Sequence, residues 1–399
     1  MSNTGYFHYW MRTQVHCAVG SVIRVPPLMQ QLGGKRVLLV SDAGLRKAGL
    51  VDRLESVFAA NQSGGQPVLA GVVDDIAPDA TASSINKATA YARAVAADSI
   101  VALGGGSVLD AAKGIKYSLA HHLTDIQEVL LGGIRFETSP PSGPMGIPHI
   151  AVPTTAGTGA EVTNGAVILC ERLGGAKGGL VVPYLEADIA VLDAGLTVGL
   201  PRSITADTGM DALTHAIEIV ANPNSNCFTD AGVFTATALI DHWLPIVTRD
   251  PGNLVGRSAM LQASTMACLA LVNVLGPMPV HNCAHALGAL YHIPHGRANG
   301  VLLPAVMEVL RDFYRPTSER LARAFGIPTA GRSADELLDR VTARLRALQA
   351  EIGMPTTFPE IRKDQMPQIV QAISRDPVAM FYPMTAVQIE QIIDKVIAT

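Results

Sequence analysis

The chain has 399 residues, more than one hydrophobic core usually accommodates, so two domains are expected. Hydrophobic residues make up 48% and charged residues 16%, which is enough apolar material for large cores and excludes a disordered chain. The formal net charge is −4, without a long run of one sign. This balance argues against nucleic acid or an anionic membrane surface as the main partner.

Targeting and redox signals favour the cytoplasm. The N-terminus lacks a basic start followed by an apolar stretch, so no secretory signal is predicted. The longest uninterrupted apolar runs, such as residues 37–40, are much shorter than a bilayer span. Five scattered cysteines form no Cys-x-x-Cys pair, which predicts inert, buried, free thiols in a reducing compartment.

The first half of the chain alternates strand-like with helix-like segments. Short β-rich runs are predicted at 35–42, 67–73, 99–103, 151–153 and 189–193. Helical periodicity separates the first three runs, at 45–60 and 82–97. Such alternation is typical of parallel β-α units with both faces of the sheet covered.

After about residue 196 the strand signal gives way to apolar residues at spacings of three and four. Helices are predicted at 203–221, 227–247, 257–275, 283–290 and 318–324. We therefore predict an α/β domain over residues 1–195 and an all-helical domain over residues 196–399.

A glycine-rich segment follows the third predicted strand and opens a helix. Its Gly-Gly-Gly-Ser sequence, from Gly104, permits torsions closed to other residues and leaves free N–H groups at a helix start. A phosphate would be stabilised there by the helix dipole. Because the spacing is not the Gly-x-Gly-x-x-Gly fingerprint, a plain glycine turn is an equal alternative at this point.

Two further features fit a nucleotide at the ends of strands. Thr154, Thr155 and Thr158 offer hydroxyls in a loop after another predicted strand, although the same pattern also caps helices. Asp42 ends the first predicted strand, where a carboxylate would bind an adenosine ribose and favour NAD over NADP. The commoner alternative is an aspartate that forms a turn.

The helical half holds residues suited to a metal ion. Asp211 and His215 are four residues apart on one helix face, and His281 and His285 repeat this spacing before His295. Burying such a group in an apolar setting without a shared partner would be costly, so the pattern predicts metal binding. A carboxylate with several imidazoles favours Fe(II), Zn(II) or another divalent transition metal over Mg(II) or Ca(II).

The isolated histidines are interpreted differently, because a lone histidine on an apolar face is usually a satisfied core residue. This prediction covers His8, His16, His121, His122, His149 and His242.

Taken together, the motifs resemble the iron-containing (group III) alcohol dehydrogenase family. Gly-Gly-Gly-Ser-x-x-Asp-x-x-Lys from Gly104 and Pro-Thr-Thr-Ala-Gly-Thr from Pro153 precede Gly-Met-Asp-Ala-Leu-Thr-His-Ala-Ile-Glu from Gly209 and His-x-x-x-His-x8-Pro-His-Gly from His281. They occur in the family's order, and the similarity covers essentially the whole chain. The resemblance implies an α/β dinucleotide-binding domain, an all-helical C-terminal domain as in dehydroquinate synthase, and an active site between them.

The resemblance also implies roles for individual residues. The expected metal ligands are Asp211, His215, His281 and His295. His285 aligns with the family's non-ligand histidine near substrate and nicotinamide. Cofactor contacts are expected at Asp42, Gly105, Gly106, Ser107, Val108, Leu109, Asp110, Thr154, Thr155, Thr158 and Lys177. The expected cofactors are NAD and one divalent metal, with Fe²⁺ ahead of Zn²⁺.

The chain departs from the family pattern in the expected substrate pocket. Val272 stands where many members have an aromatic residue, and Gly-Pro-Met-Pro at 276–279 replaces a Gly-x-Gly. Substrate size is therefore not carried over from the family. On the adenine side, Pro-Asp-Ala-Thr at 78–81 replaces the usual Pro-Asn-Pro-Thr.

The predicted reaction is hydride transfer between a small alcohol or aldehyde and nicotinamide, with a metal-activated alkoxide and His285 relaying the proton. A homo-oligomer is expected. One alternative is a dehydroquinate synthase-like lyase, which would need several Lys and Arg where the chain offers Met278, Pro279, Val280 and Leu287. The other is a non-catalytic assembly subunit.

Overall fold

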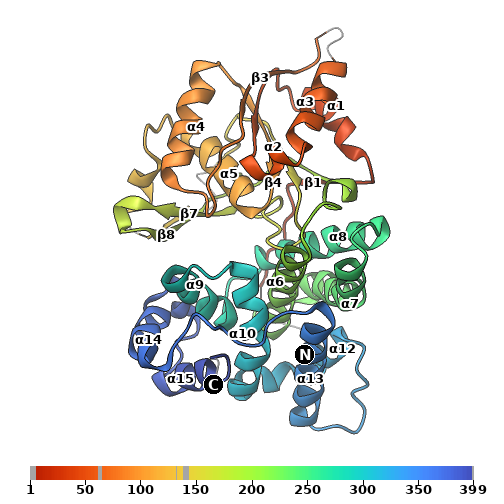
Figure 1. Ribbon diagram of the computed structural model, residues 1–399, viewed down its shortest axis with the longest axis vertical. Helices are drawn as coiled ribbons and strands as arrows, with labels where there is room; N and C mark the ends of the chain where they lie inside the picture. Colours follow the sequence, from red (N-terminus) through yellow and green to blue (C-terminus); the bar gives the residue numbers. More distant parts are fainter. Residues whose placement is uncertain (1–5, 62–64, 132, 138–142, 398–399) are drawn as a thin grey trace. The chain divides into compact units, whose positions relative to one another are not determined.

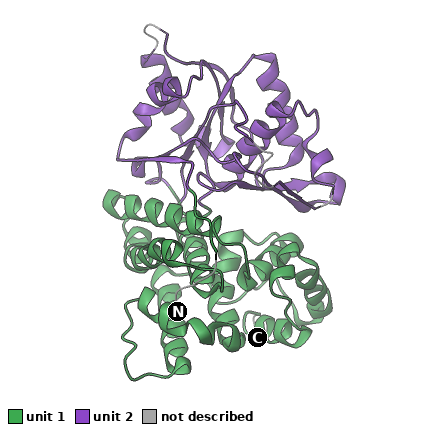
Figure 2. Cartoon of the chain, turned by 180° about the vertical axis from the view of Figure 1, so that it is seen from behind, with its two compact units in different colours: residues 1–10, 156–158, 200–399 green, residues 11–155, 159–199 purple. Residues whose placement is uncertain are grey.

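A computed structural model describes residues 6–61, 65–131, 133–137 and 143–397. By its internal contacts the chain forms two compact units, coloured separately in Figure 2. An α/β unit comprises residues 11–155 and 159–199, and a helical unit comprises residues 1–10, 156–158 and 200–399. The main division falls between Gly199 and Leu200. The sequence analysis placed it four residues earlier, between residues 195 and 196.

Two short segments from the first half of the chain belong to the helical unit, and specific contacts explain this. The Trp10 amide donates to Asn273 Oδ1 at 2.7 Å. Gly157 packs against α6 (Arg202–Ala221) so closely that a Cβ there would lie 2.8 Å from Thr208 Cβ. Both contacts depend on tertiary packing, so sequence periodicity does not reveal them.

A wholly parallel six-stranded sheet runs through the α/β unit in the order β1-β9-β6-β4-β2-β3 (Figure 1). Its strands are β1 (Gln14–Cys17), β2 (Arg36–Val40), β3 (Val68–Val73), β4 (Ser99–Gly104), β6 (His149–Pro153) and β9 (Ile189–Leu192). The surrounding helices are α1 (Val25–Gln31), α2 (Ala43–Lys47), α3 (Leu50–Ala60), α4 (Ala82–Ala94) and α5 (Gly106–Ala120). The five predicted strands are confirmed as β2, β3, β4, β6 and β9.

Alternating side chains of the central strands divide between two cores. Leu38 and Ile100 pack with residues of α4 and α5 on one face, while Leu39 and Val101 pack with residues of α1 and α3 on the other. This alternation follows from the two-residue period of a strand. Figure 1 shows helices on both faces of the sheet.

The sequence analysis missed β1 and a small second sheet. That sheet has the order β5-β8-β7, from β5 (Ile134–Phe136), β7 (Gly165–Cys170) and β8 (Ala176–Val181). β7 carries an apolar run at residues 166–170 that the sequence analysis overlooked, whereas β8 contains two adjacent glycines and β5 has only three residues. The predicted helix 45–60 is two helices, α2 and α3, because Gly49 takes a left-handed conformation with φ of 76°.

The helical unit contains α6 (Arg202–Ala221), α7 (Cys227–Arg249), α8 (Leu254–Leu271), α9 (Pro279–Tyr291), α10 (His295–Val309), α11 (Arg311–Tyr314), α12 (Ser318–Ala324), α13 (Ala334–Ile352), α14 (Met366–Arg375) and α15 (Ala386–Asp394). The five predicted helices are confirmed as α6 to α9 and α12, with ends shifted by up to four residues. One continuous apolar core holds the unit together.

Among the described residues, α8 is long and apolar enough to cross a membrane by length and composition. Polar residues interrupt its apolar stretches, so the uninterrupted apolar runs in the sequence did not indicate it. Of its 18 residues, 67% are buried inside the structure, as in the core helix of a globular unit.

Two expectations about isolated polar residues are wrong. Only His149 of the six isolated histidines is a core residue, and neither of its ring nitrogens has a hydrogen-bond partner among the described residues. Burial lowers the pKa of His149 well below its ordinary value, which keeps the ring neutral. All five cysteines are free, as predicted, but Cys17 and Cys227 are exposed rather than buried.

Candidate metal and nucleotide sites

Three helices bring Asp211, His281 and His295 together in the helical unit. One ligand atom from each residue lies within 4.8 Å of the others. His281 Nε2 is 3.8 Å and His295 Nε2 is 3.5 Å from Asp211 Oδ1. These side chains come from α6, α9 and the first residue of α10.

His215, the fourth expected ligand, lies beside this group but outside it. Its ring stacks on that of His281, with centroids 4.4 Å apart. His215 Nδ1 lies 3.5 Å from the buried Cys268 Sγ on α8. The helical spacing thus brings His215 to the site, and its role as a ligand stays a prediction.

The protonation states around the site suit a cation. Burial alone would raise the pKa of Asp211, but the three neighbouring histidines and the Asn299 amide lower it below its ordinary value. Burial lowers the pKa of His281 well below its ordinary value. A carboxylate and a neutral imidazole are the forms that bind metal ions.

One buried atom in the group lacks a partner. Within the described part of the chain, His281 Nε2 has no hydrogen-bond partner. Solvent hardly reaches it either, because the residue is only 3% exposed. A buried polar atom without a partner costs free energy. The donor set, with one carboxylate and imidazoles, fits a divalent transition metal at this point.

His285 lies one turn after His281 on α9, at the edge of the group. Its ring stacks on that of His295 at a centroid distance of 5.3 Å. His285 Nδ1 lies 3.5 Å from Asp376 Oδ2, and its side chain is 26% exposed. A partly exposed imidazole beside a carboxylate suits a residue that exchanges protons with solvent.

Two buried polar residues that the sequence analysis left without a role support the group. Glu218 on α6 contacts His281 through its carboxylate. Asn299 on α10 donates to Asp211 Oδ1 at 2.6 Å and lies 3.1 Å from His295 Nε2. Glu218 follows His215 by three residues and Asn299 follows His295 by four, so helical spacing offered a signal for both. Cys268 and Asp376 had no such signal.

The expected nucleotide residues of the α/β unit gather at the carboxyl edge of the sheet. Asp42 follows β2, Gly105 follows β4, and Thr154 and Thr155 follow β6, and these three strands are neighbours. The strand order reverses between β2, which connects outward to β3, and β4, which connects to the opposite side. Nucleotides bind at such switch points in parallel sheets.

The glycine loop makes a tight strand-to-helix turn. A Cβ on Gly104 would lie 2.4 Å from Val108 Cβ, so the close packing of β4 against α5 requires glycine. No side chain caps the start of α5. The amides of Val108 and Leu109 donate to Gly105 O, whereas Gly106 and Ser107 form the first turn, where amides have no intrahelical partner. This arrangement favours the phosphate-binding interpretation over a plain turn.

Several expected cofactor residues also have structural contacts. Asp42 caps α2 by accepting from the Leu45 amide at 3.0 Å, which is the turn-forming role. Asp110 ties α5 to the small sheet, since its two oxygens accept from Lys113 Nζ and the Val167 amide. Their contacts with a cofactor stay predictions.

The last two expected residues lie apart from the loop. Lys177 on β8 pairs with Asp79 Oδ1 at 2.9 Å, and the Asp79 amide donates to Ser107 Oγ at 3.1 Å. Lys177 is therefore linked to the glycine loop through Asp79, one of the departures from the family pattern. Thr158 belongs to the helical unit.

Comparison with known proteins decides the family. The model of the iron-containing alcohol dehydrogenases matches residues 12–194, and the model of the C-terminal region of the Fe-containing alcohol dehydrogenase family matches residues 205–397. The chain belongs to the iron-containing alcohol dehydrogenase family. It is thus an oxidoreductase that acts on alcohols, and its family implies a divalent metal.

Individual relatives agree with this assignment. Long-chain-alcohol dehydrogenase 1 of Geobacillus thermodenitrificans is 35% identical over 86% of this chain and 83% of that protein. The probable alcohol dehydrogenase EutG of Salmonella typhimurium is 35% identical over 95% of this chain and 91% of that protein. The crystal structure of a 1,3-propanediol oxidoreductase superposes with a TM-score of 0.85 at 31% identity, covering 98% of this chain and 99% of that one. These relatives favour the dehydrogenase over the lyase and the assembly subunit.

Proposed function

We propose that the protein is an NAD-dependent and divalent metal-dependent alcohol dehydrogenase or aldehyde reductase. The observation that carries this proposal is the buried group of Asp211, His281 and His295, whose ligand atoms lie within 4.8 Å of one another. The unpartnered His281 Nε2, in the described part of the chain, supports a further partner for the group. Fe²⁺ is the first candidate by family, and Zn²⁺ suits the same donors.

The side chains of the group would hold the metal, with His215 as the fourth ligand. When bound, the metal would act as a Lewis acid that lowers the pKa of an alcohol hydroxyl or polarises a carbonyl. His285 would accept the released proton at a ring nitrogen and pass it to solvent, since its side chain is 26% exposed.

The α/β unit would hold NAD at the carboxyl edge of its sheet. The amides of Gly106 and Ser107 would bind the pyrophosphate at the uncapped start of α5. Asp42 would accept hydrogen bonds from the adenosine ribose through the oxygen that does not cap α2, which favours NAD over NADP. Bound NAD supplies the hydride acceptor.

We infer a primary alcohol or its aldehyde as substrate. Relatives at 35% and 30% identity are named as dehydrogenases of long-chain alcohols and of 1-propanol. Val280, which directly precedes His281 on α9, is apolar and fully buried, which suits a weakly charged substrate. A cytoplasmic, homo-oligomeric enzyme is part of the same proposal, and five free cysteines suit a reducing compartment.

The test is an assay of protein purified without oxygen and loaded with Fe²⁺ or Zn²⁺. We expect reduction of NAD, and less reduction of NADP, with primary alcohols of increasing chain length. A chelator should abolish the activity and added metal should restore it. If metal-loaded protein neither reduces NAD with any alcohol nor oxidises NADH with any aldehyde, the proposal is wrong. Light scattering on the same preparation tests self-association.

A further inference from the structure

Glu218 extends the row of site residues along α6. It follows Asp211 by seven residues and His215 by three, which places all three on one face of the helix. The residue is 0% exposed. A carboxylate is rarely buried to this extent unless it has fixed partners.

Both oxygens of Glu218 contact α9. Oε1 accepts from the Val280 amide at 2.7 Å. Oε2 lies 2.5 Å from His281 Nδ1. Val280 is the second residue of α9, where amides lack an intrahelical partner, so one carboxylate holds both the helix start and the imidazole ring.

This contact decides which ring nitrogen of His281 is available to the group of Asp211, His281 and His295, called the metal group below. An imidazole has two nitrogens, and a proton on Nδ1 leaves the lone pair on Nε2. With Nδ1 held by Glu218, Nε2 lies on the side of Asp211, 3.8 Å from its Oδ1. The ring orientation and the tautomer required of a ligand are thus set by the same bond.

We propose that Glu218 is a positioning residue that fixes the tautomer and orientation of His281 for a divalent cation and couples both to the start of α9. This proposal rests on the proposed function. Groups that hold a metal-binding histidine in this way typically contribute 10- to 100-fold to metal affinity, so an effect of about that size is expected here.

If Glu218 only capped α9, Glu218→Gln would bind metal with the affinity of the wild type. The positioning role predicts weaker binding, for the following reason. Glutamine keeps the shape, and its carbonyl oxygen can still accept from the Val280 amide. Its NH₂ group would then face His281 Nδ1 and cannot accept a proton from it. The tautomer with the proton on Nε2 would be favoured, which blocks the ligating lone pair while the helix start stays capped.

The experiment compares metal affinity in three purified proteins: the wild type, Glu218→Gln and Glu186→Gln. Glu186 is a matched control, because it is a buried carboxylate of the α/β unit, 3% exposed and paired with Arg12. Dissociation constants for Zn²⁺ and Co²⁺ are measured by competition with a chromophoric chelator. Thermal unfolding of the metal-free proteins reports on structure.

We expect Glu218→Gln to raise the dissociation constant about 10- to 100-fold and to change the visible spectrum of bound Co²⁺. Glu186→Gln should bind metal like the wild type. A Glu218→Gln protein with wild-type affinity and an unchanged Co²⁺ spectrum overturns the proposal. A wild type that binds neither ion overturns the proposed function itself, so the two failures are distinguishable.

A measurement on the wild type covers the case in which Glu218→Gln does not fold. In Zn²⁺-loaded protein labelled with ¹⁵N-histidine, the His281 Nδ1 proton should give a downfield resonance that exchanges slowly with solvent. If Nδ1 of His281 carries no proton, or a proton that exchanges at the rate of an exposed imidazole, the proposal is wrong.

Discussion

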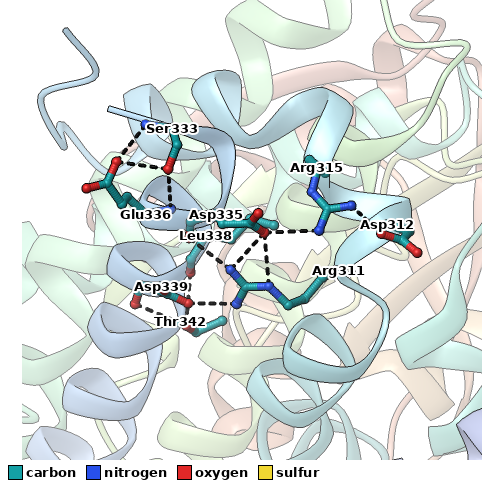
Figure 3. Close-up of polar contacts among 9 residues, drawn as sticks. All are labelled: Arg311, Asp312, Arg315, Ser333, Asp335, Glu336, Leu338, Asp339 and Thr342. Carbon is teal, nitrogen blue, oxygen red and sulfur yellow. Dashed lines mark hydrogen bonds and ion pairs between the residues drawn. The ribbon is translucent and has the colours of Figure 1, made fainter. Parts of the chain in front are cut away.

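The helical unit contains two dense groups of charged or ionisable residues that differ in exposure. On its surface, Arg311 and Arg315 both pair with Asp335, and Arg311 also reaches Asp339 (Figure 3). The two aspartates of this network are 52% and 66% exposed. In the metal group, by contrast, Asp211 is 2% exposed.

The two groups also differ in what completes them. Each of the two surface aspartates has an arginine partner and is exposed to solvent, so the network needs no further partner. In the metal group Asp211 contacts imidazoles and an amide, and His281 Nε2 has no hydrogen-bond partner among the described residues. Exposed charges can be paired by solvent, whereas buried ones need a partner of opposite charge. This difference supports the proposal that a cation binds at the buried group and not at the surface network.

The pKa shifts follow the same division. Two arginines, Arg315 and Arg311, lower the pKa of Asp335. Burial raises the pKa of Glu218 above its ordinary value, against the hydrogen bond from Val280 and the nearby histidines. A nearby cation would bring such a carboxyl back toward its ionised form.

The largest expected effect is that of His281→Ala. Removing a buried ligand should abolish metal binding and lower turnover by about 1000-fold or more, because Lewis-acid stabilisation is worth several kcal/mol. Metal content by elemental analysis and steady-state kinetics check this. His242→Ala, at an exposed histidine on α7, is the control and should behave like the wild type. Full turnover by His281→Ala without bound metal would contradict the idea that the buried group, unlike the surface network, depends on a cation.

Metal removal should come next in size. An ion that binds only the folded state at 100 times its dissociation constant stabilises that state by about 2.7 kcal/mol. We expect this loss in the free energy of urea unfolding when a chelator is added to the wild type. Asp335→Asn should lose as much, since its metal group is intact. Equal stability of the wild type with and without metal would refute the idea that the buried group lacks its partner.

A smaller effect is expected at Asp207, one turn before Asp211 on α6. Burial raises its pKa to about 6, although Arg297 opposes the shift. Because the folded-state pKa exceeds the unfolded one, this group stabilises the fold fully below the unfolded pKa, and the stabilisation is lost as the pH rises through about 6.

Asp207→Asn should remove that loss. Between about pH 4 and pH 7 the stability of the wild type should fall relative to the variant by about 2 kcal/mol, after allowance for partial exposure. Urea unfolding of both proteins across this range provides the measurement. Parallel pH profiles would show that burial does not perturb this carboxylate.

The smallest effect is expected for Asp335→Asn in the surface network. Its side chain is 52% exposed, and surface ion pairs contribute little because water and salt screen them. The melting temperature and the metal affinity should both match the wild type within error, as measured by calorimetry and chelator competition. A large loss of either would mean that the surface network is coupled to the metal group.

Much of this protein is determined by local sequence patterns. The apolar runs of β2 and β4 and the three- and four-residue spacing of α6 and α9 were sufficient to predict two kinds of unit. The i, i+4 pair of Asp211 and His215 predicted a shared helix face, and the glycines after β4 predicted a strand-to-helix turn. These features depend on the period of a strand or helix, which a short stretch of sequence contains.

Only the tertiary structure decided which groups meet. Glu218 contacts a histidine 63 residues away, and Asn299 contacts an aspartate 88 residues away. The small sheet of β5, β7 and β8, the unpartnered burial of His149 and the contact of Cys268 with His215 likewise depend on how distant segments pack. Periodicity gives the direction of a side chain from its own helix or strand. The partner that it reaches is set by the packing of the whole core.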